Sequence, residues 1–292
     1  MKNHLDTEYL TLLKKILEYG VTRNDRTNTG TVSLFGEQLY HPLHAGFPLL
    51  TSKKVSLKTV ATELKWFLRG DTNIRYLVDN GCNIWNGDAY KKYCKLQVPH
   101  DHFETQEEFI ELIKTDDEFA NKWGELGPIY GGQWRDVNGI DQLANLMENI
   151  KNDPFSRRLI INSWNVSELN QMTLPPCHYA FQVYVVEGHL DLLWTQRSAD
   201  MFLGVPFNLA SYGLLLLVLC HELNLKPGKI IGHFGDIHLY QNHLSQAYQQ
   251  VKAATYELPQ VKILSSDILK GEFEYELIDY KHSPVINAKL NN

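Results

Sequence analysis

HYAFQVYVVEGHLDLLWTQRS (residues 178–198) and FNLASYGLLLLVLCHEL (residues 207–223) are the two stretches that decide the fold. The first is rich in β-branched and aromatic residues on both sides of Glu187 and Gly188, which predicts a two-strand hairpin that turns there. The second is apolar nearly all round, which predicts a helix buried at the centre of the protein. Strands and a central helix are therefore expected in one core.

Helical and strand patterns intermix along the rest of the chain. Helical spacing is found in LDTEYLTLLKKILEYG, SLKTVATELKWFLRG, TNIRYLVDNG and IDQLANLMENIKND, and strands are predicted in TVSLFGEQL and RRLIINSW. KIIGHFGDIHLYQNHLSQAYQQVKAA predicts a strand, a turn and a further helix. The order lacks the regular βαβ alternation of a doubly wound sheet, so the sequence predicts an α+β fold.

A single domain is expected over residues 1–292, because no Pro-, Ser- or Gly-rich linker divides the chain. Within it, residues 87–124 are polar and charged, with helical spacing but few large apolar residues. We expect this segment to be a peripheral insertion or a small helical subdomain.

Composition and charge argue against several classes of protein. The net charge of −6 disfavours non-specific nucleic-acid binding, which needs a basic surface. Four cysteines without a CxxC pair indicate neither a zinc site nor a disulfide framework. The N-terminus lacks the apolar core of a signal peptide, and the longest apolar run, 214–220, is shorter than the roughly 20 residues that span a bilayer. We therefore expect a cytoplasmic protein with reduced thiols and with no nucleic acid, membrane or metal as a partner.

TLPPCHYAFQVYV (residues 173–185) places Cys177 between two prolines and a predicted strand. Two interpretations are open. The thiol is a small buried hydrophobe that happens to start a strand, or it is a nucleophile aimed by rigid backbone.

Three arginine clusters lie where apolar segments stop, in NDRTNTG, SRR and TQRSAD. Arginine pairs bidentately with phosphate, and a neighbouring serine hydroxyl adds a donor. A lone arginine is usually a solvated surface residue, but three such clusters in an acidic protein make a local anion-binding pocket an equal alternative. The residues concerned are Arg26, Arg157, Arg158, Gln196, Arg197, Ser198 and Asp200.

Asn208 and Glu63 each have a structural and a functional interpretation. Asn208, at the mouth of the apolar helix, suits an N-cap, but its amide also matches the O4 and N3–H edge of uracil. A carboxylate in its place would suit the amino group of cytosine. Glu63 lies among apolar and aromatic residues in TELKWFL, although helix surfaces carry glutamates routinely.

His238 and Tyr240 in GDIHLYQNH are two residues apart, and so lie on one side of an extended segment. His238 and His243 lack the spacing of an HExxH site, so no metal is expected. Trp85 and Trp134 lie beside glycine turns. Most tryptophans belong to the core, although a flat heterocyclic ligand would need one as a wall.

These clusters, in this order, closely resemble the thymidylate synthase family over nearly the whole chain. The resemblance is carried by NDRTNTGT, GFPLLTSKK, ELKWFLRGDTN, GELGPIYGGQWR, SRRLIINSWN, LPPCHYAFQVYV, QRSADMFLGVPFNLASYG and GDIHLYQNH. It implies a large mixed β-sheet covered by helices. It also implies reductive methylation of dUMP to dTMP, with 5,10-methylenetetrahydrofolate as the one-carbon and hydride donor and dihydrofolate as the second product.

The resemblance implies a catalytic role for six residues: Cys177, Arg197, Asn208, Glu63, Tyr130 and Asp200. Cys177 would add as a thiolate to C6 of the uracil ring and so turn C5 into a nucleophile. Arg197 would supply the positive charge that favours the thiolate. Asn208 would read the uracil edge. Glu63 would move protons through water near O4, and Tyr130 would organise the water that takes the C5 proton.

Binding roles follow from the same resemblance. The dUMP phosphate would be held by Arg26, Arg197 and Ser198. Arg157 and Arg158 would reach that phosphate from the neighbouring subunit, so each site would be shared in a homodimer.

The sugar and the folate have their own residues in the resemblance. His238 and Tyr240 would bind the deoxyribose 3′-hydroxyl, where a hydroxyl-reading pair discriminates well. Asp200 would hydrogen-bond the pterin, Trp85 would pack against it, and Lys53 would lie near the glutamate tail of the folate. Gln196 and Asp200 are also assigned to the dUMP site, and His178 matches a family position near the cysteine without being assigned as the base.

Three departures from the family pattern stand out. Asn86-Gly87-Asp88 stands where many relatives have Asp-Glu-Trp, Asn28 replaces a common glycine, and the tail INAKLNN is more polar than the usual ending. A polar tail raises one alternative, a dUMP hydroxymethylase, in which water captures the methylene group and gives 5-hydroxymethyl-dUMP. The other alternative is a non-catalytic nucleotide- or RNA-binding relative.

Overall fold

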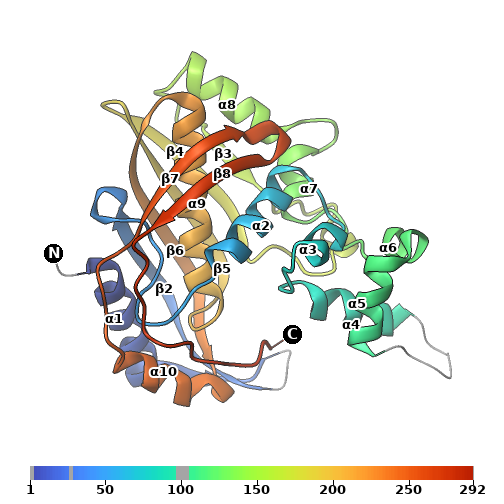
Figure 1. Cartoon of the computed structure of the whole chain (residues 1–292), viewed down its shortest axis with the longest axis horizontal. Coiled ribbons are helices and arrows are strands. Elements are labelled where there is room, and N and C mark those ends of the chain that lie inside the picture. Colours follow the sequence, from blue (N-terminus) through green and yellow to red (C-terminus); the bar gives the residue numbers. More distant parts are fainter. Residues whose placement is uncertain (1–2, 26–28, 97–104, 292) are drawn as a thin grey trace.

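The computed structural model describes residues 3–25, 29–96 and 105–291. Its centre is a six-stranded sheet with the strand order β1-β2-β6-β5-β4-β3 (Figure 1). β5 and β6 are parallel and the other neighbours are antiparallel, which confirms the predicted α+β fold with a mixed sheet. The strands are β1 (Val21–Arg23), β2 (Thr31–Pro42), β3 (Ile160–Asn162), β4 (His178–Val186), β5 (His189–Asp200) and β6 (Lys226–Tyr240).

The predicted central helix is α9 (Gly204–Leu223), which packs against β5 and β6. It is long and apolar enough to cross a membrane, but 67% of its most apolar window is buried inside the protein, as expected of a core helix. The other helices outside the 87–124 segment are α1 (His4–Tyr19), α2 (Leu57–Leu68), α3 (Arg75–Asp79), α7 (Tyr130–Arg135), α8 (Gln142–Asn152) and α10 (Leu244–Val251). Single 3₁₀ turns are η1 (Leu43–Ala45), η2 (Leu169–Gln171), η3 (Gln241–His243) and η4 (Ile268–Lys270).

The β4–β5 hairpin turns where the sequence predicts. Glu187 and Gly188 have φ values of 48° and 75°, the left-handed conformation that both central residues of a type I′ turn adopt. The first predicted helix ends as expected too, because Gly20 caps α1 with its backbone N–H on the carbonyl of Ile16.

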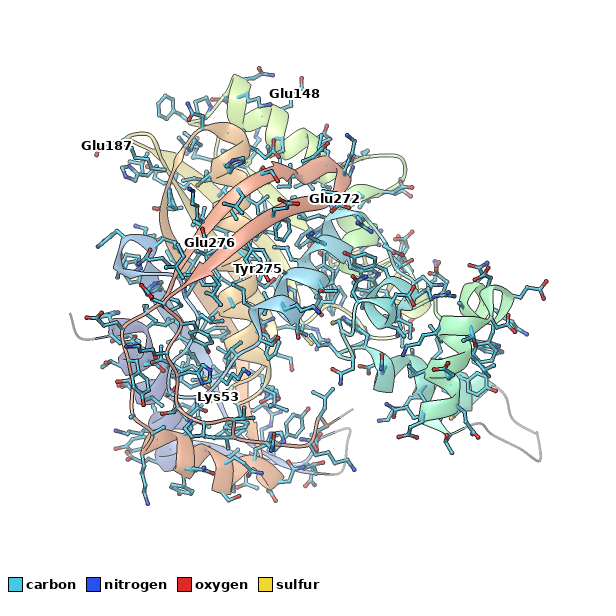
Figure 2. The ribbon with its side chains drawn as sticks, viewed as in Figure 1. Lys53, Glu148, Glu187, Glu272, Tyr275 and Glu276 are labelled. Carbon is cyan, nitrogen blue, oxygen red and sulfur yellow. The ribbon has the colours of Figure 1, made fainter. Side chains whose placement is uncertain are left out.

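A second, two-stranded sheet was not predicted. β7 (Gln260–Asp267) and β8 (Glu272–Ile278) form a hairpin that lies in front of α9 in Figure 1. Its strands expose many polar side chains, so they lack a clear apolar alternation. Glu272, labelled on the hairpin in Figure 2, ties it to α2 through ion pairs with Lys65 and Arg69.

The segment between Gly87 and Gly124 contains α4 (Asn86–Leu96), α5 (Gln106–Thr115) and α6 (Asp117–Trp123). These helices lie together at one end of the molecule, away from the six-stranded sheet (Figure 1). Tyr93 contacts the rings of Phe109, Phe119 and Trp123, so aromatic side chains supply the apolar contacts that aliphatic residues supply elsewhere. The assignment of this segment as an insertion within one domain stays a prediction.

Candidate active site

The sheet topology brings the polar clusters of the sequence together at one end of the strands. β4 begins beside the far end of β5, because the two strands are antiparallel. β6 runs parallel to β5 and ends next to it, and the antiparallel β2 begins beside the end of β6. The paired residues are His178 with Gln196, Ser198 with Asp236, Asp200 with His238, and Tyr240 with Thr31.

Cys177 lies at this end of the strands, one residue before β4 begins, and its side chain is partly exposed. The interpretation as a buried hydrophobe is therefore wrong. Arg197 donates from Nη2 toward the Cys177 sulfur at 3.9 Å, which places a positive charge beside the thiol. The same guanidinium donates to the carbonyls of Pro176 (3.0 Å) and Pro175 (2.7 Å), so it holds the Pro-Pro turn and the sulfur together.

Tyr130 supports Cys177 from the other side. Its hydroxyl accepts a hydrogen bond from the backbone N–H of Cys177 at 2.8 Å, and its ring is buried. Tyr130 begins α7 with φ of 26°, a conformation that a residue with a large side chain rarely adopts. Burial raises its pKa well above the ordinary value, so the hydroxyl stays protonated.

Glu63 is buried, so its interpretation as an ordinary helix-surface residue is wrong. The indole N–H of Trp85 donates to its Oε1 at 2.8 Å. Burial raises the pKa of Glu63 from 4.5 to about 7, and the hydrogen bond from Trp85 opposes this shift only in part. A carboxyl group that exchanges its proton near neutral pH suits general acid–base work.

Three aromatic residues, Phe67, Tyr130 and Tyr212, surround His178, the residue after the cysteine. Its ring lies 4.4 Å from the ring of Tyr130, and its Nδ1 lies 2.9 Å from the hydroxyl of Tyr212. Burial lowers the pKa of His178 to about 3, so the imidazole is neutral and a poor base at physiological pH. Tyr212, in the middle of α9, was not singled out from the sequence, because an apolar helix hides it among core residues.

Asn208 does not cap α9, so the N-cap interpretation is wrong. The helix begins four residues earlier, at Gly204. Asn208 instead lies in its second turn, where its Oδ1 accepts a hydrogen bond from Gln196 Nε2 at 3.1 Å. Gln196 also donates to the carbonyl of Ser198 at 3.0 Å, so a buried amide fixes the orientation of the Asn208 amide.

Asp200 shapes the turn that leads into α9. Its Oδ1 accepts the backbone N–H groups of Phe202 (2.9 Å) and Leu203 (3.2 Å). Within the described part of the chain its Oδ2 has no hydrogen-bond donor, so this oxygen remains able to bind a ligand N–H group.

Lys53, labelled in Figure 2, is a buried residue that lies next to the Asp200 turn. Its ammonium donates to the carbonyl of Phe202 and lies 3.7 Å from the centre of the Phe202 ring. Burial lowers the pKa of Lys53 from 10.5 to about 7, while the nearby Asp200 opposes that shift. The structure therefore places this lysine against the Asp200 turn.

His238 and Tyr240 meet at the end of β6, with their rings perpendicular and 5.3 Å apart. Asp236 joins them, because its Oδ1 lies 3.0 Å from His238 Nδ1. Asp236 was missed in the sequence, although its place two residues before His238 on a strand puts both on one side. Trp134 is a core residue, with its indole N–H on Ser163 Oγ at 2.8 Å.

Two predicted residues are not brought to Cys177 within one chain. Arg157 and Arg158 are exposed and precede β3, whose Ile160 pairs with Gln182. Gln182 lies five residues along β4 from Cys177, about 17 Å at the rise of an extended strand. The third predicted phosphate ligand, Arg26, lies outside the described residues, as does Asn28.

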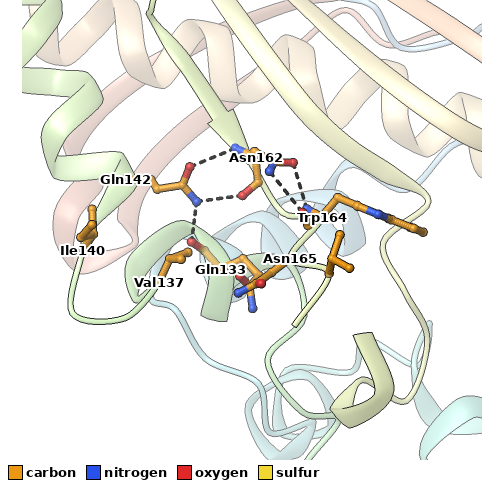
Figure 3. Close-up of a pocket in the computed structure, with 8 residues that line it drawn as sticks. Gln133, Val137, Ile140, Gln142, Asn162, Trp164 and Asn165 are labelled. Carbon is orange, nitrogen blue, oxygen red and sulfur yellow. Dashed lines mark hydrogen bonds between the residues drawn. The ribbon is translucent and has the colours of Figure 1, made fainter. Parts of the chain in front are cut away.

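Residues of α7, α8, β3 and the segment after β3 line a cavity of about 360 Å³ (Figure 3). Its walls include Gln133, Gln142, Asn162 and Trp164, and the Gln142 side chain bonds the backbones of Gln133 and Asn162. None of the predicted site residues lines it, although the Arg197 guanidinium lies 5.5 Å from the Trp164 ring. Among the described residues, no group of three or more His, Cys, Asp or Glu side chains could hold a metal ion.

The sequence of the chain is similar to those of known proteins over nearly its whole length. The sequence model described as "Thymidylate synthase" matches residues 7–291. The chain is 49% identical over 288 residues to "Thymidylate synthase" of Mycoplasma pneumoniae, covering 97% of this chain and 99% of the relative. It is 52% identical over 272 residues to the protein of that name from the Aster yellows witches'-broom phytoplasma, covering 93% of each chain. The Mesoplasma florum protein of the same name is 51% identical, with 92% of this chain and 94% of the relative covered.

Proposed function

The chain belongs to the thymidylate synthase family and is a methyltransferase enzyme, and we propose that it converts dUMP to dTMP through a covalent bond between Cys177 and C6 of the pyrimidine. The observation that carries this proposal is the position of the Arg197 guanidinium, 3.9 Å from the Cys177 sulfur and bonded to both preceding prolines. A neighbouring positive charge stabilises a thiolate, and the thiolate is the nucleophilic form of cysteine.

The first step is addition of the Cys177 thiolate to C6. The new S–C6 bond forms as the electrons of the C5–C6 double bond move toward O4, which makes C5 nucleophilic. After the transferred carbon bonds to C5, loss of the C5 proton and cleavage of the bond from that carbon to the folate would leave a methylene group on C5. Transfer of the hydride to this group would make it a methyl group and leave dihydrofolate. The S–C6 bond then breaks, and the thiolate is regenerated. Tyr130 holds the Cys177 backbone by a hydrogen bond, and this contact keeps the sulfur in one place during both steps.

Negative charge that develops on O4 requires a proton donor and a fixed amide. Glu63, with its pKa near 7, is able to give and take a proton at neutral pH. Gln196 donates to the Asn208 carbonyl oxygen and so holds the Asn208 amide. The NH₂ group of Asn208 is then left to donate to the O4 side of uracil. This arrangement supports uracil over cytosine as the base.

The folate co-substrate supplies the one-carbon unit and the hydride. The residues that would hold it are Asp200, whose Oδ2 is available for a pterin N–H, and Trp85, which adjoins Glu63. Lys53 adds a buried cation next to Asp200 and supports its turn.

A homodimer completes the phosphate site in this proposal. Arg157 and Arg158 lie far along the sheet from Cys177 of their own chain, so they would serve the site of a second copy. The sheet supports such a contact, because the face opposite α9 exposes large side chains. Tyr184 and Ile160 on this face are 59% and 51% exposed. A cytoplasmic location stays a prediction.

The C-terminal tail bears on the hydroxymethylase alternative. The Asn291 and Asn242 amides exchange two hydrogen bonds, of 2.8 and 3.1 Å. The Lys289 carbonyl accepts a hydrogen bond from His243 Nε2 at 2.8 Å. Because the polar end of the tail is bonded to the protein rather than left to recruit water, this pairing supports methylation.

The proposal is tested by trapping and by product analysis. Incubation with 5-fluoro-dUMP and methylenetetrahydrofolate should leave a covalent adduct on the peptide that contains Cys177, because fluorine at C5 cannot leave as a proton does. The peptide with Cys94, another partly exposed thiol, is the internal control. With dUMP, mass spectrometry should find dTMP and dihydrofolate in equal amounts. Formation of 5-hydroxymethyl-dUMP without dihydrofolate, or an unmodified Cys177 peptide from active protein, would overturn the assignment.

A further inference from the structure

The side chains of Arg23, Asp236 and His238 form a hydrogen-bonded chain. Arg23 of β1 donates from Nη1 to Asp236 Oδ2 at 3.1 Å, and the other carboxylate oxygen lies 3.0 Å from His238 Nδ1. β1 and β6 both pair with β2, so the arginine reaches Asp236 across one intervening strand.

The position of the His238 ring is tightly constrained. The side chain is only 7% exposed, and the ring of Tyr240 contacts it at a right angle. Asp236, His238 and Tyr240 alternate along β6, so all three lie on one side of the strand. The ring therefore has little freedom to turn over and exchange its two nitrogens.

The carboxylate decides which nitrogen carries the proton. An ionised carboxylate only accepts hydrogen bonds, so His238 Nδ1 must be the donor in this contact. The hydrogen bond from His238 lowers the pKa of Asp236, and the Arg23 charge adds to the effect, so Asp236 is ionised. In the neutral imidazole the remaining nitrogen, Nε2, is then an acceptor. It forms no hydrogen bond with the residues that the structure describes.

We propose that Asp236 is a positioning residue that fixes the tautomer of His238 and thereby makes the site select nucleotides with a 3′-hydroxyl. The inference rests on the proposed function, with His238 at the deoxyribose 3′-hydroxyl as the family resemblance implies. A 3′-hydroxyl donates its proton to the Nε2 acceptor. A nucleotide without that hydroxyl leaves a buried acceptor unpaired, which is the arrangement that gives strong discrimination.

The test compares dUMP with 2′,3′-dideoxy-UMP as substrates of the wild type and of Asp236→Asn. The asparagine keeps the size of the side chain but is able to donate as well as accept, so it no longer forces the proton onto Nδ1. We expect the ratio of kcat/KM for the two nucleotides to fall about tenfold, which corresponds to one hydrogen bond. The matched control is Ser266→Ala, which removes a partner of Nδ1 from His221 at the far end of α9. It should leave the ratio unchanged.

Three further outcomes keep the proposal separate from the proposed function. If the wild type makes no dTMP, calorimetric affinities for the two nucleotides replace kcat/KM, and an equal affinity ratio in the wild type and Asp236→Asn overturns the inference alone. A wild type that does not distinguish the two nucleotides also overturns it. If Asp236→Asn fails to fold, ¹⁵N chemical shifts of the wild-type His238 ring decide, and a proton on Nε2 instead of Nδ1 contradicts the proposal.

Discussion

The chemistry of single residues at this site depends on burial. Glu63 and Lys53 are both buried, and both have a pKa near 7, although a free glutamate and a free lysine differ by about six units. Loss of hydration disfavours the charged form of each group, so the acid becomes weaker and the base becomes weaker too. Each of these two side chains therefore gains and loses its proton near neutral pH.

We predict that Glu63→Gln stabilises the folded protein at alkaline pH. The folded-state pKa is raised, so the unfolded chain releases this proton first, and wild-type stability falls as pH rises from about 4.5 to 7. The neutral glutamine avoids that loss, which at pH 8 amounts to roughly 3 kcal/mol for a shift of this size. Urea unfolding of the wild type and of Glu63→Gln at pH 4 and pH 8 measures this difference in unfolding free energy.

The control for this prediction is Glu148→Gln, which changes an exposed helix glutamate (Figure 2). Its unfolding free energy should follow that of the wild type at both pH values. An equal stability of Glu63→Gln and the wild type at pH 8 would show that the carboxyl is not desolvated.

Arg197 bonds the carbonyls of Pro175 and Pro176 and places a positive charge near Cys177, and two substitutions separate these effects. Arg197→Lys keeps the charge near Cys177 but cannot donate to Pro175 and Pro176 at once, whereas Arg197→Gln loses the charge. Alkylation of Cys177 by iodoacetamide at pH 7 should slow about tenfold more in the glutamine variant, since the reaction needs the thiolate. Equal alkylation rates in the two variants would mean that the charge does not activate the sulfur.

At the scale of elements, two loops cross close to Cys177. The loop before α7 carries Gly127, and a Cβ atom there would lie 2.1 Å from the carbonyl oxygen of Gln171. Gly127 also has φ of 83°, which other residues adopt at a cost. Because the backbone N–H of Thr173 bonds the carbonyl of Leu126, this crossing links Tyr130 to the turn before Cys177.

We predict that Gly127→Ala destabilises the protein by about 2–4 kcal/mol and lowers kcat, because the loops must separate and Tyr130 moves from Cys177. Gly139→Ala is the matched control, with φ of 82° but nothing within 4 Å of its added Cβ. It carries the conformational cost alone, about 1 kcal/mol. Thermal unfolding and steady-state kinetics of both variants test this prediction. If both variants lose similar amounts of stability and of kcat, the contact between the two loops does not position Tyr130.

At the scale of the whole molecule, one sheet face remains available for a second copy. The β4 side chains alternate between buried residues that face α9 and exposed residues such as Tyr184. A sheet buried on one face only is stable alone, but large exposed side chains favour association. The proposed homodimer uses this face and brings Arg157 and Arg158 to the partner's phosphate site.

Mixing two inactive variants tests that assembly. Cys177→Ala lacks the proposed nucleophile, and the double variant Arg157→Glu with Arg158→Glu lacks the arginines that we propose to be shared. Mixed dimers should contain one complete site, so random exchange of subunits should restore about a quarter of wild-type activity. Sedimentation should show a dimer for each variant. No recovery of activity after demonstrated exchange would contradict shared sites.

Local patterns in the sequence were enough to predict the sheet-forming hairpin, the buried α9 and the order of the polar clusters. The Glu187-Gly188 turn, the continuous apolar run of α9 and the stiff Pro-Pro-Cys turn each depend on neighbouring residues, so one sequence segment contains the whole signal. The family resemblance extended this by relating those segments to roles at one site.

Only the tertiary structure decided which side chains are buried together. The burial of Glu63 under Trp85, the contact of Arg23 with Asp236 more than 200 residues away, and the β7–β8 hairpin depend on packing between distant segments. The turn just before α9 depends on Asp200, whose carboxylate accepts the N–H groups of Phe202 and Leu203, so the helix begins at Gly204 rather than at Asn208. Burial and cross-strand register arise from the whole fold, and they set the pKa values and hydrogen bonds on which the chemistry depends.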